Sequence, residues 1–367
     1  MPLFIVFIMG AMLCGAGAML APALPTSQPR VGLAAAFTLA LIMGGSLFML
    51  SLTANDPLVI DYVLFALLSG TVLGGTIAQA QTRAEAKGEE LSDADQGWTG
   101  PQDLLFFVLV GILLTGVLLI TQPFQTGASS AGLEMLTSYV SRQLRQTHPI
   151  VQRALGAVIA FLAIWVVYDF GSEWRGKPLG RCLALAAIPV VVALYANGHF
   201  VVLLGVLFGL AMLIFLQQAV QTRQRLDLVA AGLMFGACLY ASVEALIVMA
   251  LVALAWTWYL QRPKPTGLPR TRLLWLIPLI ALLATGPWWL THLELVASNA
   301  YEMLRSPDDA LLLVAAFGSI SAGGWMLWAL WRQIPADLRA MLRQRYYVLA
   351  VITAVVLVAG IVLSRAG

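Results

Sequence analysis

The 367-residue chain is 60% hydrophobic and only 11% charged, with a mean hydropathy of +0.87. Soluble globular proteins carry about 25% charged residues, so this composition excludes an ordinary soluble domain. The formal net charge of +3 gives no reason to expect a nucleic-acid partner. The composition instead predicts an all-α fold, a polytopic transmembrane helical bundle embedded in membrane lipids.

Polar and Pro/Gly-rich stretches divide the chain into about twelve apolar runs, most of them near the length that a helix needs to cross a bilayer. The expected spans are 3–24, 31–53, 57–79, 103–121, 150–169, 181–196, 199–218, 227–243, 244–261, 272–290, 309–331 and 346–364. The first run lacks the basic start of a secretory signal peptide, so we expect a retained helix. The pattern gives a three-span segment over 1–80, a polar cytoplasmic linker over 81–102 and a multi-span domain over 103–367.

The orientation of the spans follows from the basic residues, because lysine and arginine concentrate in cytoplasmic loops. Placing alternate loops in the cytoplasm puts most of the 21 lysines and arginines there and turns both chain ends outward. The outer side then receives all 3 histidines and several glutamates. These outer residues include His148, His199, His292, Glu134, Glu244 and Glu294.

One long outer segment, 121–153, contains the pattern of a surface helix. Leu133, Leu136, Val140 and Leu144 recur at helical spacing, whereas Glu134 shares another face with Ser138, Ser141 and Arg145. This separation of apolar and polar faces predicts an amphipathic helix that lies along the membrane surface.

Within the spans, charges are few. Asp61, Arg153 and Asp169 lie near span ends, where we expect snorkelling or interfacial water to satisfy them. Three GxxxG pairs predict close helix packing within one bundle: Gly70/Gly74, Gly205/Gly209 and Gly232/Gly236. Tryptophans and tyrosines gather near the span ends, as in an interfacial aromatic belt. No P-loop, dinucleotide fingerprint, HExxH or CxxCH sequence supports an ATPase, a dinucleotide enzyme, a zinc protease or a c-type haem protein.

Three stretches between residues 104 and 308 resemble the membrane core of the GT-C glycosyltransferases, polytopic enzymes related to protein mannosyltransferases and lipid A aminoarabinose transferases. The first begins HPIVQRALG at 148 and reaches 180. The second begins FVVLLGVLFG at 200 and reaches 252, and the third begins LIALLATGPWW at 279 and reaches 306.

The resemblance implies a sugar donor linked to polyprenyl phosphate and transfer on the outer face of the bacterial cytoplasmic membrane, within the cell envelope. In the family, a carboxylate just after the first core span deprotonates the acceptor hydroxyl, and nearby carboxylates hold a divalent cation against the phosphate. The corresponding segment here, Gln122 to Gly132, contains no acid, and Glu134 is the first carboxylate after it.

Three hypotheses of function follow. An active transferase would use Glu134 as its base, and His148, His199, Glu244, His292 and Glu294 would hold the acceptor, the phosphate or a divalent cation. A non-catalytic GT-C-like accessory or structural subunit, a pseudoenzyme among other membrane subunits, would explain the missing acid. A transporter or lipid flippase has less support, because the spans show no paired set of Gly/Pro-interrupted helices in matching halves.

Overall fold

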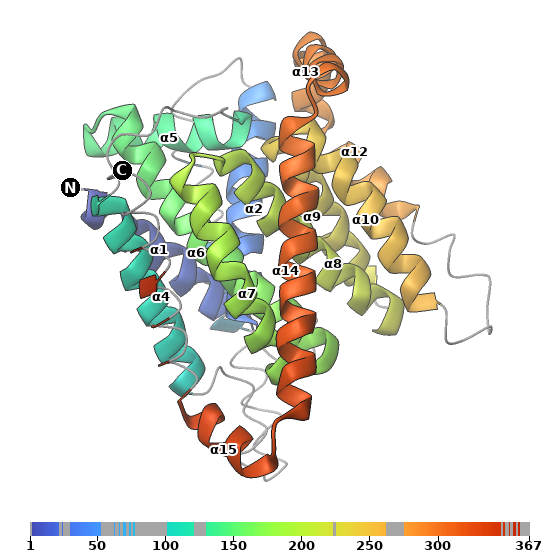
Figure 1. The fold of residues 1–367 in the computed structure, drawn as a ribbon. Helices are drawn as coiled ribbons and strands as arrows, with labels where there is room; N and C mark the ends of the chain where they lie inside the picture. The colour runs from blue at the N-terminus through green and yellow to red at the C-terminus, as the bar shows by residue number, and fades with distance from the viewer. Residues whose placement is uncertain are drawn as a thin grey trace.

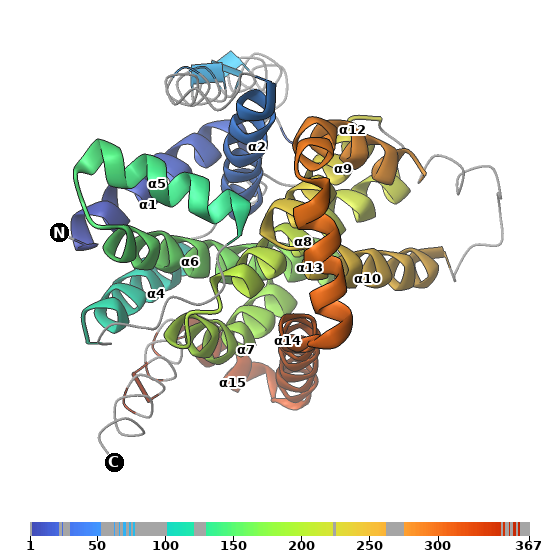
Figure 2. The ribbon, with the colours of Figure 1, turned by 90° about the horizontal axis from the view of Figure 1, so that it is seen from above.

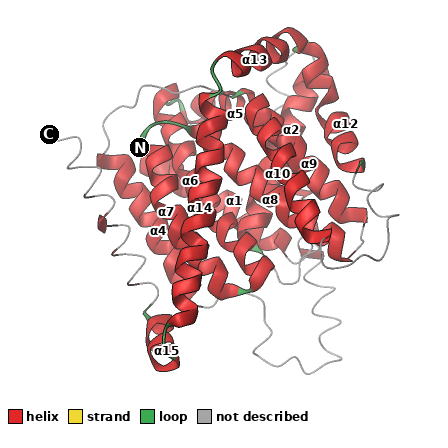
Figure 3. Ribbon diagram, turned by 45° about the vertical axis from the view of Figure 1, so that its right-hand side comes forward, coloured by secondary structure: helices red, strands yellow, loops and turns green. Residues whose placement is uncertain are grey.

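The computed structural model describes residues 2–21, 30–52, 101–120, 130–222, 225–261 and 275–345, together with single positions between 24 and 77 and between 348 and 359. Within these residues every regular element is a helix, so the all-α prediction is confirmed (Figure 1, Figure 3). The elements in chain order are α1 Pro2–Leu20, α2 Val31–Leu52, α4 Pro101–Ile120, α5 Ala131–Leu144, α6 His148–Arg175, α7 Lys177–Ala196, α8 Phe200–Thr222, α9 Arg225–Ala241, α10 Val243–Gln261, α12 Leu276–Thr291, α13 Leu293–Arg305, α14 Asp308–Gln333 and α15 Ala336–Gln344.

Six of the described helices are long and apolar enough to cross a membrane, namely α2, α6, α7, α8, α10 and α14. A seventh crossing is added if α12 and α13, which are bent by 99° at their junction, are counted together. Shorter apolar segments lie in α1, α4 and α9. The linker predicted over 81–102 and the spans predicted over 57–79 and 346–364 fall largely outside the described residues.

The long helices run back and forth between two ends of the bundle (Figure 1). We name the ends after the short helices that lie across them: α5 and α13 cover one end, which is the α5 end, and α15 lies at the other, which is the α15 end (Figure 1, Figure 2). The described basic residues of the predicted cytoplasmic loops share the α15 end. They include Arg30, Arg175, Lys177, Arg181 and Arg332.

The amphipathic helix predicted within residues 121–153 is present as α5. Leu133, Leu136 and Val140 are buried against the bundle, and Glu134 is exposed, as the spacing predicted. The helix begins where the Ser130 hydroxyl accepts a hydrogen bond from the backbone N–H of Leu133 at 3.3 Å, a typical N-cap that satisfies one of the free N–H groups of the first turn.

Two of the three GxxxG pairs pack helix against helix, as predicted. Gly205 and Gly209 face α10, and the Gly232/Gly236 pair faces α12. Around the Gly70/Gly74 pair, no described atom lies within 4 Å of the position that a Cβ would take, so this pair does not pack against the part of the chain that the structure describes.

The expectation that Asp169 is satisfied by snorkelling or interfacial water is wrong. The residue is only 1% exposed, and its Oδ2 accepts a hydrogen bond from the backbone N–H of Leu33 at 2.9 Å. The carboxylate on α6 therefore caps the first turn of α2, where free N–H groups favour a negative charge. Arg153 is partly buried, and Asp61 falls outside the described residues.

Two buried ion pairs hold the α15 end together. Arg30 donates to Glu173 at 3.0 Å, and Gln218 donates to the same carboxylate. Arg181 donates through two nitrogens to Asp103, at 2.8 and 3.2 Å. Buried charges are costly unless they are paired and hydrogen-bonded, so these contacts favour the observed packing of α4 on α7, and of α6 on α8 and on the residue that precedes α2.

Candidate functional site

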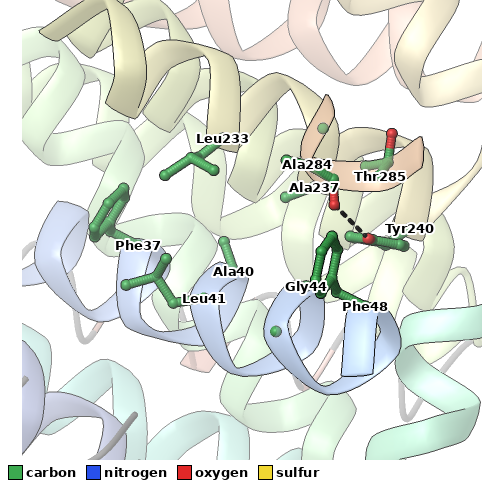
Figure 4. A pocket seen from close by; sticks show the side chains of 12 residues that line it. Phe37, Ala40, Leu41, Gly44, Phe48, Leu233, Ala237, Tyr240, Ala284 and Thr285 are labelled. Carbon is green, nitrogen blue, oxygen red and sulfur yellow. Dashed lines mark hydrogen bonds between the residues drawn. The ribbon is translucent and has the colours of Figure 1, made fainter. Parts of the chain in front are cut away.

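A partly open apolar groove lies between α2, α9 and α12 (Figure 4). Its volume is about 220 Å³. Its walls consist mostly of aliphatic and aromatic side chains and three glycines, and they are formed by Phe37, Ala40, Leu41, Gly44, Gly45, Phe48, Leu233, Gly236, Ala237, Tyr240, Ala284 and Thr285.

The two hydroxyl groups in the groove wall are already used within the protein. Thr285 donates to the carbonyl of Ala281 at 2.8 Å, and Tyr240 donates to the carbonyl of Ala284 at 3.5 Å (Figure 4). Pockets that enclose whole small molecules usually measure about 300–1,000 Å³, which is larger than this groove. The groove therefore suits a segment of hydrocarbon chain that continues into the bilayer.

Small residues create the groove. Gly44 and Gly45 leave a gap on the face of α2 that turns toward α9, since neither carries a side chain. A Cβ at Gly44 would stand 3.3 Å from the ring of Tyr240, and one at Gly236 would stand 3.1 Å from Thr285. Larger residues at these positions would fill the space between the helices.

A row of three rings in contact connects the groove with the α5 end. The Tyr240 ring lies 5.6 Å from that of Trp288, and the Trp288 ring stacks on His292 at 5.2 Å. His292 Nδ1 lies 2.9 Å from the carbonyl of Trp288. The same Nδ1 lies 2.9 Å from the hydroxyl of Thr291.

Two of the six predicted site residues lie on elements next to this row of rings. His292 is the hinge residue between α12 and α13. Glu134 lies in the first turn of α5, whose Gly132 packs against Met43 and against Tyr240, a wall residue of the groove. The structure thus brings the start of α5 and the end of α12 to the same region of the α5 end.

Glu244 and Glu294 also lie at the α5 end, in the first turns of α10 and α13. Glu244 is partly buried and Glu294 is exposed. Neither residue lines the groove. Their predicted roles in holding substrate stay predictions.

His148 and His199 lie apart from the groove. His148 begins α6, at the far end of α5 from Gly132, and a 14-residue helix is roughly 21 Å long. His199 lies in the turn between α7 and α8, where its Nδ1 approaches Asp309 of α14 at 3.9 Å. The structure therefore groups His199 with Asp309 rather than with Glu134.

A divalent cation held by several protein ligands does not fit the described part of the chain. No group of three or more histidine, cysteine, aspartate or glutamate side chains among the described residues is placed to hold a metal ion. We therefore assign no step to a metal.

A second apolar groove of about 90 Å³ lies on the other side of α2, beneath α5. Its walls are formed by Met9, Met12, Leu13, Leu39, Ile42, Leu136, Tyr139 and Val140. Neither groove was predicted from the sequence. The adjacent Gly44 and Gly45 within an apolar run were the signal that could have indicated the first one.

The fold and the grooves define a helical integral membrane protein with an apolar groove beside a surface helix. No protein family, no curated protein and no solved structure matches the chain.

Proposed function

We propose that this chain is a GT-C-type membrane protein that binds a polyprenyl-phosphate-linked sugar and transfers the sugar at the outer surface of the bacterial cytoplasmic membrane. The α5 end faces outward in this proposal, in keeping with the concentration of basic residues at the α15 end. The whole chain would cross the membrane about twelve times.

The observation that carries the proposal is the apolar groove of about 220 Å³ between α2, α9 and α12. A polyprenyl chain is a long hydrocarbon, and burying each of its methylene-sized groups contributes about 0.8 kcal/mol. The groove supplies such a surface and contributes no uncommitted hydroxyl of its own. The lipid chain would lie in the groove, and the phosphate would lie toward the α5 end, near His292.

The proposed reaction assigns different roles to Glu134 and His292. The acceptor hydroxyl oxygen forms a bond to the anomeric carbon of the sugar, and the bond from that carbon to the phosphate oxygen breaks. The hydroxyl proton passes to the exposed carboxylate of Glu134, and the electron pair stays on the departing polyprenyl phosphate. When the ring of His292 is protonated, its Nε2–H donates to a phosphate oxygen.

Photo-crosslinking with a polyprenyl phosphate that carries a diazirine in its chain tests the binding step. Ala284→Phe fills the groove and should abolish labelling of α2, α9 and α12. Leu283→Phe is a matched control, because the neighbouring side chain on α12 is 66% exposed and does not line the groove. Equal labelling of the two variants would exclude the groove as the lipid site.

A transfer assay with the full-length protein in nanodiscs tests the chemical step. Loss of a general base typically lowers the rate by about 10²–10⁴-fold, so Glu134→Gln should lower turnover to this extent while labelling of the groove persists. Ser141→Ala, on the same helix, should leave turnover unchanged. Unchanged turnover in Glu134→Gln would remove Glu134 from the mechanism.

A non-catalytic accessory subunit is the second function that we consider. It is favoured by the lack of a carboxylate in the walls of both described grooves and by the missing acid between Gln122 and Gly132. Such a subunit would bind the lipid and assemble with other membrane subunits. Lipid labelling without turnover, together with stable co-purification of partner subunits from the native membrane in mild detergent, would favour it over the transferase.

A further inference from the structure

Arginines and tryptophans form a cluster at the α15 end, opposite the groove. The guanidinium carbon of Arg175, at the end of α6, lies 5.6 Å from the centre of the Trp174 ring, 5.4 Å from that of Trp325 and 5.6 Å from that of Trp328. Arg332, in the last turn of α14, lies 5.0 Å from the centre of the Trp328 ring. The two arginines are therefore neighbours over one indole ring.

These two arginines differ from the other cations at this end. Arg30 and Arg181 are paired with buried carboxylates. Arg175 and Arg332 are exposed, and among the described residues neither forms an ion pair with a carboxylate. Their positive charges are therefore not neutralised by the described part of the protein.

We propose that Arg175 and Arg332 bind the phosphate of an anionic phospholipid in the membrane leaflet at the α15 end. A guanidinium group is planar, and its N–H groups form a fork that matches two oxygens of a phosphate. Two adjacent guanidinium groups favour an anionic headgroup over a zwitterionic one, whose amine would be repelled.

The neighbouring helix α15 supports a lipid rather than a soluble phosphate. Its Leu338 and Met341 are 48% and 46% exposed, and a short amphipathic helix with exposed apolar side chains is typical of the membrane interface. Arg339 on the same helix has a buried Nε atom without a hydrogen-bond partner. Trp325 and Trp328 lie near the end of a candidate membrane span, the usual depth of phospholipid headgroups.

Native mass spectrometry of the full-length protein in detergent, titrated with phosphatidylglycerol, tests the proposal. Each cation near an anionic membrane surface contributes about 1 kcal/mol, so Arg175→Gln/Arg332→Gln should weaken phosphatidylglycerol binding by about 30-fold. Arg142→Gln/Arg145→Gln removes the same charge from α5, at the other end of the bundle, and should leave this binding unchanged. Phosphatidylcholine should bind equally weakly to all forms.

Three results would overturn the proposal: equal losses in the two glutamine variants, no loss in Arg175→Gln/Arg332→Gln, or displacement of the lipid by millimolar inorganic phosphate. If the glutamine variant does not fold, Arg175→Lys/Arg332→Lys provides the test. It keeps both charges but lacks the planar fork, so affinity should fall by a smaller factor, and undiminished affinity would contradict binding by the guanidinium planes. The proposal is independent of the transferase reaction, since it concerns the opposite end of the bundle.

Discussion

Replacing Arg181 by methionine should strongly destabilise the bundle, because it leaves the charge of Asp103 buried without its partner. Arg181 holds Asp103 through two hydrogen bonds of 2.8 and 3.2 Å. The Asp103 side chain is 1% exposed and that of Arg181 is 17% exposed. The carboxylate therefore cannot reach solvent, whereas the guanidinium group is close to the surface.

The size of the effect follows from this asymmetry. Removing one partner of a buried ion pair typically costs about 3–5 kcal/mol. Tyr168 still donates to Asp103 Oδ2 at 3.1 Å, and a hydrogen bond to a charged group offsets about 1.5–3 kcal/mol. We therefore expect Arg181→Met to cost about 3 kcal/mol, at the lower end of the range. Asp103→Asn should cost less, because it leaves a cation near the surface and keeps an acceptor for Tyr168.

Titration with SDS at a constant concentration of the mild detergent, with unfolding followed by circular dichroism, measures these differences in the free energy of unfolding. The double variant Asp103→Asn/Arg181→Met contains neither charge of this pair and should recover at least about 1.5 kcal/mol relative to Arg181→Met alone. A loss below about 1 kcal/mol in Arg181→Met, the range of solvent-exposed pairs, would refute the reasoning. So would a double variant whose loss equals the sum of the two single losses.

Three further substitutions test other contacts. Asp169→Ala removes the acceptor for Leu33 N–H and should cost about 1–2 kcal/mol in the SDS titration; Asp169→Asn keeps an acceptor, and equal losses in both variants would contradict the cap. Gly132→Val places methyl groups against Met43 and should cost about 1–3 kcal/mol, seen as faster hydrogen exchange in α5; unchanged exchange would show that α5 does not depend on this contact. Gly176→Ala forces an alanine to φ 85° and ψ 169°, a region nearly restricted to glycine, and should cost about 1–3 kcal/mol; a neutral effect would show that the turn between α6 and α7 adapts.

The lengths of the apolar runs predicted the described long helices well. A chain that crosses the hydrocarbon region must satisfy its backbone N–H and C=O groups internally, and a helix does so within one segment. The run predicted over 31–53 is α2, and the surface helix predicted from Leu133, Leu136 and Val140 is α5. The end of α6 was predicted too early. Asp169 was predicted to lie near the end of a span, whereas the helix continues to Arg175. Leu33 of α2 satisfies Asp169, and Arg30 and Gln218 satisfy Glu173 in the added turn.

The short surface helices α13 and α15 were not predicted, since each is too short to give a strong hydropathy signal. In α15 the signal was nevertheless present, because Leu338, Met341 and Leu342 follow Pro335 at helical spacing. The bend of 99° at His292 carried no comparable local signal. It depends on where α13 packs, and that is a property of the assembled bundle.

The candidate site could not be predicted from the sequence for a different reason. The six predicted site residues share polar chemistry and one predicted side of the membrane, and neither property says which of them lie close together in the fold. The groove forms where small residues of α2 lie next to Tyr240 of α9 and Ala284 of α12. These three helices are far apart in the sequence, so no local pattern predicts the complete groove. His292 is connected to that groove through the Trp288 and Tyr240 rings.

The carboxylates at the two ends of the bundle differ in their exposure to solvent, and this difference is relevant to the proposed function. At the α15 end, Asp103, Asp169 and Glu173 are buried, and each is held by groups from another helix. At the α5 end, Glu134 and Glu294 are exposed. A buried carboxylate that already accepts hydrogen bonds within the protein cannot reach a substrate hydroxyl, whereas an exposed carboxylate can. The buried carboxylates at the α15 end therefore link helices, and the exposed carboxylates that the proposed transfer requires lie at the α5 end.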